Sequence, residues 1–245
     1  MEASIFVYED ASELAQEAAR RIARQAVAAS RSRGRFSVAL SGGSTPGSLY
    51  RLLAENPYRG QIPWADVHIF WGDERCVPAD DPGSNYGQAV KLLLSQVPIP
   101  SDNVHRVQGE LDPPVAARLY DAALQRFFCG PRIRFDLVLL GLGTDGHTAS
   151  LFPGSDALEE KERWTAAAEN GDPSVPRVTL TLPVLNNAAA VLFLVAGSAK
   201  AGVLASLLSA DPPDIVPARR VRPPHGDTII FADQAAVAGL SPGSR

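Results

Sequence analysis

The sequence predicts an α/β fold, with a mainly parallel β-sheet that carries helices on both faces. Short apolar stretches of strand length alternate along the chain with stretches whose apolar residues recur at helical spacing. That alternation is typical of a parallel sheet covered by helices. Polar, glycine-rich segments follow four of the strands, after Leu40, Trp71, Leu140 and Ala196. Because such sheets bind ligands beyond the carboxyl ends of their strands, these segments predict where the site lies.

Each element follows from its local pattern. The expected strands are short and apolar: Ser4–Tyr8, Phe36–Leu40, Val67–Trp71, Leu137–Leu140, Ala189–Ala196 and Thr228–Phe231. The expected helices cover Ala11–Arg31, the stretch from Pro46 through Leu53, Val115–Phe128 and Ala199–Leu208. The first of them is rich in alanine and places Leu14, Ala18, Ile22 and Ala26 on one face. Segments 154–176 and 209–226 are polar or rich in proline and predict surface loops.

Composition excludes several classes of function. Hydrophobic residues make up 45% of the 245 residues and charged residues 20%, as in globular proteins. We find no repeat and no linker that divides residues 1–245, so one domain is expected. The net charge of −4 argues against nucleic-acid binding, which needs a concentrated basic face. The short run of Arg31, Arg33 and Arg35 is interpreted as the solvated end of a helix.

Location and assembly are less strongly marked. No apolar run reaches the roughly 18 to 20 residues that span a bilayer, and the N-terminal stretch lacks the pattern of a signal peptide. Cys76 and Cys129 are too few for a disulfide framework and lack metal-ligand spacing. We therefore expect a cytoplasmic protein. No interface stripe stands out, so the expectation stays at a monomer or a small homo-oligomer.

The stretch SGGSTP, residues 41–46, follows an apolar strand and has the features of an anion site. Gly42 and Gly43 allow a tight turn with exposed N–H groups, Ser44 or Thr45 can cap a helix, and Pro46 suits its first turn. Free N–H groups and the helix dipole then both favour a bound phosphate. The spacing differs from a P-loop, and the lysine of that motif is absent. A turn that binds nothing remains the alternative.

Three charged residues, Asp73, Glu74 and Arg75, follow the strand VHIFW. Arg75 can form a bidentate pair with a phosphate. Equally, the three side chains can pair among themselves and order a loop. The motif alone leaves both interpretations open.

The stretch GLGTDG, residues 141–146, satisfies the pattern of a dinucleotide-binding turn but not its context. Pro153 would stop the required helix, and the acidic residues about 20 positions on follow no apolar strand. The glycines instead indicate a sharp turn that projects Asp145 and His147 into the cleft. Histidine titrates near neutrality and can take a proton from water, with Asp145 orienting it. The alternative is a structural histidine bonded to its loop.

The remaining candidates are weaker. Lys200 follows Gly197 and the strand VLFLVA, at a place suited to a second cation for phosphate. His68, His105 and His225 lie in segments without other signs of a site. No cluster of histidine and acidic residues has metal-ligand spacing, and no G-x-S-x-G marks a serine hydrolase. We expect no metal and no cofactor.

Five segments together resemble the 6-phosphogluconolactonases, the lactone-hydrolysing enzymes of the oxidative pentose phosphate pathway. They are SGGSTP (41–46), GDERCVPADDPGSNYG (72–87), GLGTDGHTASLFPGS (141–155), LPVLNNA (182–188) and GSAK (197–200). They occur in the family's order through most of the chain. Thr144 departs from the pattern, since proline is common there. The resemblance implies a Rossmann-like fold of the kind found in glucosamine-6-phosphate deaminase and ribose-5-phosphate isomerase.

The deaminases are the main rival within this resemblance, because they also carry a D-G-H element. Their D-G-H is followed by a short apolar run and N-E-P, where the glutamate assists acid/base chemistry. Phe152 stands where that glutamate would fall, and the D-E-R of 73–75 differs from the deaminases' D-E-Y. The sequence therefore favours hydrolysis of 6-phospho-D-glucono-1,5-lactone. A sugar-phosphate sensor without activity is a further alternative, although it would be expected to lose His147 or Asp145.

The resemblance also implies roles for particular residues. The expected phosphate ligands are Ser41, Gly42, Gly43, Thr45, Arg75 and Lys200. His147 is expected to be the general base and Asp145 to orient it. Asn85 and Asn187 are expected near sugar hydroxyls, and Arg220, chosen over Arg219, near the substrate. The donor for the tetrahedral oxyanion is left unassigned.

Overall fold

The protein is described by a computed structural model that covers residues 3–130, 133–169, 175–209 and 216–240. A six-stranded sheet lies at its centre, in the order β1-β9-β8-β5-β2-β3. All neighbouring strands in it run parallel. The strands are β1 (Ser4–Tyr8), β2 (Phe36–Leu40), β3 (Val67–Trp71), β5 (Leu137–Leu140), β8 (Ala190–Val195) and β9 (Asp227–Asp233). The predicted α/β fold with a mainly parallel sheet is thus confirmed.

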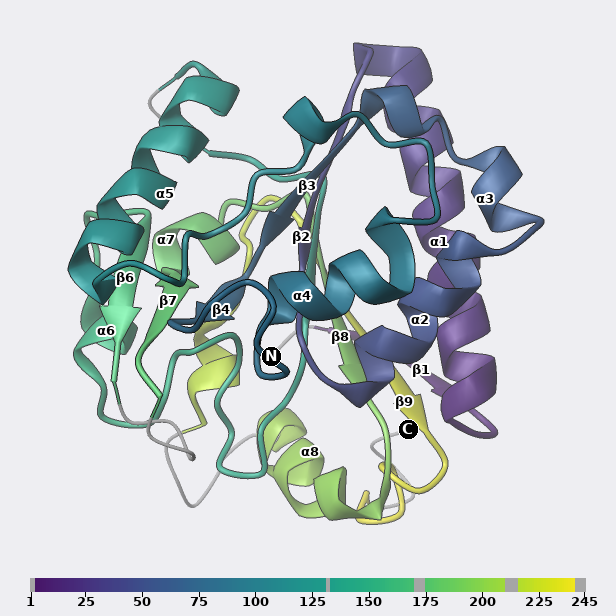
Figure 1. Ribbon diagram of the computed structural model, residues 1–245. Helices are drawn as coiled ribbons and strands as arrows, with labels where there is room; N and C mark the ends of the chain where they lie inside the picture. Colours follow the sequence, from purple (N-terminus) through teal and green to yellow (C-terminus); the bar gives the residue numbers. More distant parts are fainter. Residues whose placement is uncertain (1–2, 131–132, 170–174, 210–215, 241–245) are drawn as a thin grey trace.

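Helices cover both faces of this sheet (Figure 1). The α-helices are α1 (Ala11–Arg33), α2 (Ser44–Ala54), α3 (Tyr58–Gln61), α4 (Asn85–Ala89), α5 (Pro113–Phe128), α6 (Asp156–Glu159), α7 (Leu182–Leu185) and α8 (Ala201–Leu208). Helices α1 and α2 pack on one face, whereas α5 and α8 pack on the other. No helix in the described part of the chain is long and apolar enough to cross a membrane.

The strands divide the core because successive side chains point to opposite faces. In β5, Leu137 and Leu139 join the apolar cluster under α1 and α2, while Val138 and Leu140 join the cluster under α5 and α8. All four are buried. Burial on both faces explains why these strands are continuous apolar runs rather than alternating ones.

The longest helix begins and ends where local chemistry dictates. Asp10 accepts hydrogen bonds from the N–H groups of Ser12 and Glu13 and so caps the start of α1. Gly34 follows the helix with a φ of 69°, in the left-handed region that ends many helices. The apolar face predicted from Leu14 and Ile22 is buried.

A second sheet corrects the expectation of loops at two places. Strands β4 (Asp73–Arg75), β7 (Arg177–Leu180) and β6 (Thr165–Ala168) form a three-stranded sheet in the order β4-β7-β6. Both of its pairings are antiparallel. The charged segment 73–75 is therefore a strand, and α6 and β6 lie within the expected loop 154–176. Backbone pairing with β7 defines these strands, since neither DER nor TAAA carries an apolar alternation.

Candidate active site

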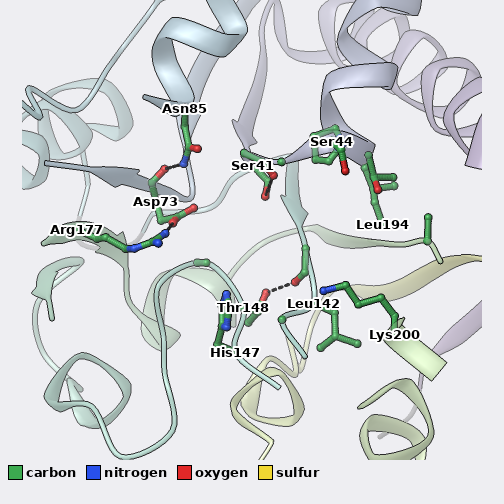
Figure 2. A pocket seen from close by; sticks show the side chains of 18 of the residues that line it. Ser41, Ser44, Asp73, Asn85, Leu142, His147, Thr148, Arg177, Leu194 and Lys200 are labelled. Carbon is green, nitrogen blue, oxygen red and sulfur yellow. Dashed lines mark hydrogen bonds and ion pairs between the residues drawn. The ribbon is translucent and has the colours of Figure 1, made fainter. Parts of the chain in front are cut away.

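A pocket of about 240 Å³ lies at the carboxyl ends of the parallel strands. It has the size for a small molecule, and it lies where ligands bind in sheets of this kind. Its lining includes Ser41, Gly42, Gly43, Ser44, Thr45, Asp73, Arg75, Asn85, His147, Arg177 and Lys200. In Figure 2, Lys200 enters from the side opposite Arg177, with His147 between them. Most of the residues predicted from sequence therefore meet in one pocket.

The start of α2 forms one wall of the pocket. The N-cap is Gly43, with a φ of 109°, and no side chain accepts a hydrogen bond there. This corrects the expectation that Ser44 or Thr45 caps the helix, because Ser44 is already its first residue. A helix start without its own cap leaves backbone N–H groups for a ligand, and the helix dipole adds positive potential. The wall therefore suits an anion such as phosphate.

Asn85 connects this wall to Arg75. A Cβ atom at Gly42 would lie 1.9 Å from Asn85 Oδ1, so only glycine allows this close approach. Asn85 Oδ1 accepts a hydrogen bond from Arg75 Nη1, which also donates to the Gly83 carbonyl at 2.8 Å. The amide of Asn85 donates to the carbonyl of Asp73 at 2.8 Å. Arg75 is thereby held beside the loop that begins α2.

Glu74 holds the segment that carries these residues. Its buried carboxylate accepts hydrogen bonds from the backbone N–H groups of Arg75, Asn85 and Tyr86 at 2.7 to 2.8 Å. Burial raises the pKa of Glu74, although these hydrogen bonds oppose the shift. The structure contradicts the hypothesis that the side chains of Asp73, Glu74 and Arg75 form ion pairs with one another. Within the described ranges, Arg75 forms no ion pair.

His147 and Asp145 form a hydrogen-bonded pair in the turn after β5. The distance from His147 Nδ1 to Asp145 Oδ1 is 2.5 Å, and the same oxygen accepts from the His147 backbone N–H at 3.1 Å. Burial raises the pKa of Asp145, but these hydrogen bonds and the nearby imidazole outweigh it and lower the pKa overall. With Nδ1–H donated to Asp145, Nε2 is the nitrogen that can accept a proton. His147 lines the pocket, whereas Asp145 is not among the residues that line it.

The turn is built closely around this pair. A Cβ atom at Gly143 would lie 2.1 Å from His147 Nδ1 and 2.6 Å from Asp145 Oδ1. The Gly143 N–H donates to the His147 carbonyl at 2.9 Å, and Thr148 Oγ1 donates to the Gly141 carbonyl at 2.8 Å. The ring of Phe152 lies 4.6 Å from the imidazole, centroid to centroid. The glycine turn therefore leaves room for the His147–Asp145 pair, as the sequence predicts.

Asp73 and Arg177 line the pocket without having been singled out from the sequence for that position. Asp73 Oδ2 accepts a hydrogen bond from Ser150 Oγ at 2.6 Å and lies 3.6 Å from Arg177 Nη1. Arg177 begins β7, directly after the segment expected to be a loop. The alternation of Val178 and Leu180 with threonines was the signal for this strand.

Three other predicted residues have distinct positions. Lys200 ends a short 3-10 helix (Ser198–Lys200) after β8 and lines the pocket. Asn187 lies before β8, at the opposite edge of the sheet, and donates to the Ile133 carbonyl at 2.5 Å. Arg220 pairs with Glu159 outside the pocket lining. The structure does not bring Asn187 or Arg220 to the other candidates, and their contacts with a substrate stay predictions.

The fold and the pocket define an α/β protein with a site for a small anionic ligand at the carboxyl edge of its sheet. The sequence matches the model of the glucosamine-6-phosphate isomerase and 6-phosphogluconolactonase family over residues 9–230, and the chain belongs to that family.

Individual relatives agree with this assignment. The chain is 43% identical to a 6-phosphogluconolactonase of Synechocystis over 86% of its length and 87% of the relative's. It superposes on a 6-phosphogluconolactonase from Trypanosoma cruzi with a TM-score of 0.89 and 33% identity, covering 98% of this chain and 97% of the other. A monomeric glucosamine-6-phosphate deaminase shares the fold, with a TM-score of 0.82 at 20% identity and coverage of 96% and 99%.

Proposed function

We propose that the protein hydrolyses 6-phospho-D-glucono-1,5-lactone to 6-phospho-D-gluconate, the lactonase step of the oxidative pentose phosphate pathway. The observation that carries the proposal is the position of His147, paired with Asp145, in the same pocket as the uncapped start of α2. One wall thus suits a phosphate and another holds a base. The names of the relatives at 33% identity and above support the same reaction.

The substrate's phosphate is proposed to bind at the start of α2. The hydroxyls of Ser41 and Thr45 and the backbone N–H groups of Gly42, Gly43 and Thr45 hold its oxygens, since the Ser41 N–H already donates to the Tyr50 hydroxyl. Lys200 and Arg75, which line the same pocket, supply positive charge. Arg75 is linked to the loop that begins α2 by its hydrogen bond to Asn85, whose side chain lies against Gly42. Asn85 itself is proposed to contact a sugar hydroxyl.

The hydrolysis needs one proton acceptor that later becomes a donor. His147 Nε2 removes a proton from water, and the resulting hydroxide attacks the lactone carbonyl. Asp145 fixes the ring through Nδ1 and stabilises the imidazolium that forms. When the tetrahedral intermediate collapses, the bond from the carbonyl carbon to the ring oxygen breaks and the imidazolium gives its proton to that oxygen.

The neighbour of His147 argues against amino-sugar deamination. Phe152 is buried and packs on the imidazole at the place where a deaminase carries its acid/base glutamate. Ring opening and isomerisation need several proton transfers, and an aromatic ring supplies none.

The cytoplasm is the proposed location, and Cys76 and Cys129 are both free thiols.

The proposal is tested by generating the lactone in situ and following its loss against the spontaneous rate. His147→Ala should lower kcat by about 10² to 10⁴, the usual contribution of a general base, while KM changes little. Ammonia release from glucosamine 6-phosphate is measured in parallel. Ammonia release would indicate the deaminase reaction, and stabilisation of the fold by the ligands without turnover would indicate a sensor. A His147→Ala variant with nearly full kcat would show that the proposed base is wrong.

A further inference from the structure

Two arginines face each other across the small second sheet, and both line the pocket. Arg75 of β4 pairs directly with Arg177 of β7 in the antiparallel register. Like charges directly opposite one another destabilise a pair of strands. The arrangement therefore costs stability unless negative charge lies near the two side chains, and Asp73 supplies part of that charge.

Both guanidinium groups have donors left over. The Nε atoms of Arg75 and Arg177 are buried and have no hydrogen-bond partner among the residues that the structure describes. Arg177 is only 8% exposed, and its ion pair with Asp73 is long, at 3.6 Å. Burial lowers the pKa of Arg177, Asp73 raises it and Arg75 lowers it further. A buried cation with an unused donor at a pocket wall is a binding group for a negatively charged oxygen.

The two arginines lead to different parts of the pocket. Arg75 is bound to Asn85 and Gly83, on the side of the loop that begins α2. The guanidinium carbon of Arg177 lies 5.6 Å from the centre of the Phe152 ring, and that ring also contacts His147. Figure 2 shows Arg177 pointing into the pocket from the side of Asp73, above His147. Arg177 therefore belongs to the wall that holds the base, and Arg75 to the wall that holds the phosphate.

We infer that Arg177 binds the oxyanion of the tetrahedral intermediate, the role for which the sequence offers no candidate. This inference rests on the proposed lactonase reaction. When hydroxide adds to the carbonyl carbon, the electron pair of the C=O π bond moves to the carbonyl oxygen, and the Arg177 guanidinium donates hydrogen bonds to that oxygen. When the pair returns, the bond to the ring oxygen breaks and His147 protonates the leaving oxygen. Arg177 stays protonated throughout.

Asp73 and Ser150 act as positioning residues for this group. Ser150 is fully buried, and its N–H donates to Thr179 Oγ1 at 3.2 Å while its hydroxyl donates to Asp73. The loop that carries His147 is thereby attached to β7, the strand that carries Arg177. Asp73 offsets part of the charge of Arg177 without occupying its Nε. A carboxylate held in this way keeps the guanidinium oriented before the substrate arrives.

Kinetics of Arg177→Gln provide the first test, with Arg75→Gln as the comparison and Arg24→Gln, on the exposed side of α1, as the control. Loss of one oxyanion donor typically lowers kcat by about 10² to 10³. We expect that loss for Arg177→Gln with little change in KM, and mainly a rise in KM for Arg75→Gln. Arg177→Lys keeps the charge and should recover part of kcat. A kcat within about threefold of wild type in a folded Arg177→Gln protein would overturn the inference.

Binding of two stable ligands separates the oxyanion role from a phosphate contact. 6-Phosphogluconate carries a carboxylate at the reacting carbon, whereas glucose 6-phosphate carries the same phosphate and no carboxylate. By titration calorimetry, Arg177→Gln should lower the affinity for 6-phosphogluconate about tenfold or more, as expected for loss of a charge-assisted pair. The affinity for glucose 6-phosphate should stay within about twofold of wild type. Arg75→Gln should weaken both. An equal loss of affinity for both ligands in Arg177→Gln would indicate that Arg177 binds the phosphate and would contradict the inference.

Failure of the wider proposal would look different. If wild-type protein does not accelerate loss of the lactone at all, the lactonase reaction itself is wrong, whatever the arginine variants bind. If wild type is active and only the Arg177 results disagree, the reaction stands and the oxyanion assignment falls. Should Arg177→Gln fail to fold, as judged by its thermal melt, Arg177→Lys carries both tests: its kcat must fall, and its affinity must fall for 6-phosphogluconate alone.

Discussion

Replacing Gly143 by alanine should disable the His147–Asp145 pair without removing either residue. The added Cβ atom would lie 2.1 Å from His147 Nδ1 and 2.6 Å from Asp145 Oδ1, whereas ordinary contacts begin at 3.4 Å. The imidazole must therefore move by roughly 1 Å or more. A misplacement of about 1 Å can lower a rate by about 10². We expect Gly143→Ala to lose about that factor in kcat.

The matched control is Gly202→Ala in α8, because a Cβ atom there meets nothing within 4 Å. Alanine favours a helix over glycine by up to about 1 kcal/mol, so this variant should be as stable as wild type or more so. Its activity should not change. Both proteins are assayed on lactone generated in situ, and the melting temperature of each is recorded.

The prediction depends on the side-chain pair rather than on the fold. The Gly143 N–H bond to the His147 carbonyl is a backbone interaction that alanine can keep. Loss of kcat with a melting temperature near that of wild type would support the argument. Wild-type kcat in a folded Gly143→Ala protein would show that the 2.5 Å contact between His147 and Asp145 is not needed for catalysis.

Two further predictions concern stability. Glu74→Ala leaves the N–H groups of Arg75, Asn85 and Tyr86 without their acceptor. At about 1 kcal/mol or more for each lost hydrogen bond, the melting temperature should fall by about 6 to 12 °C and KM should rise. A drop of under about 2 °C would contradict the anchoring role of Glu74. Burial, together with His68, lowers the pKa of His105 to about 4. In the unfolded chain His105 has a pKa of about 6.5, so its contribution to the free energy of unfolding is fully present above that pH. This contribution is lost as the pH falls toward 4, by about 1 to 2 kcal/mol once solvent screening is allowed for. His105→Phe, which keeps the stacking on Phe70, should flatten this part of the denaturation profile, and an unchanged slope would refute the assignment.

The inner strands of the central sheet were predictable because burial on both faces makes them mainly apolar runs. β2, β3 and β5 have the predicted bounds. The loop residues were predictable for a related reason, since parallel strands end at one edge and bring Ser41, His147 and Lys200 together there. Sequence reasoning from strand ends could not find Arg177, because Arg177 begins its strand and does not follow it. Asn187 shows the limit of motif order, since it lies before β8 rather than after it.

The small second sheet explains how one pocket can handle charge at two ends of a substrate. A parallel sheet presents its loops in a single row, and here that row supplies the α2 start, the base and Lys200. Groups on a second side of the ligand must come from elsewhere, and the antiparallel pair β4–β7 delivers Asp73, Arg75 and Arg177 together. Because Arg75 and Arg177 are opposite in register, the separation of their Cα atoms is fixed by backbone hydrogen bonds rather than by flexible loops. Negative charge on the phosphate and negative charge developing at the carbonyl can then be bound by different cations, so that tight binding of the first does not use the donor needed for the second.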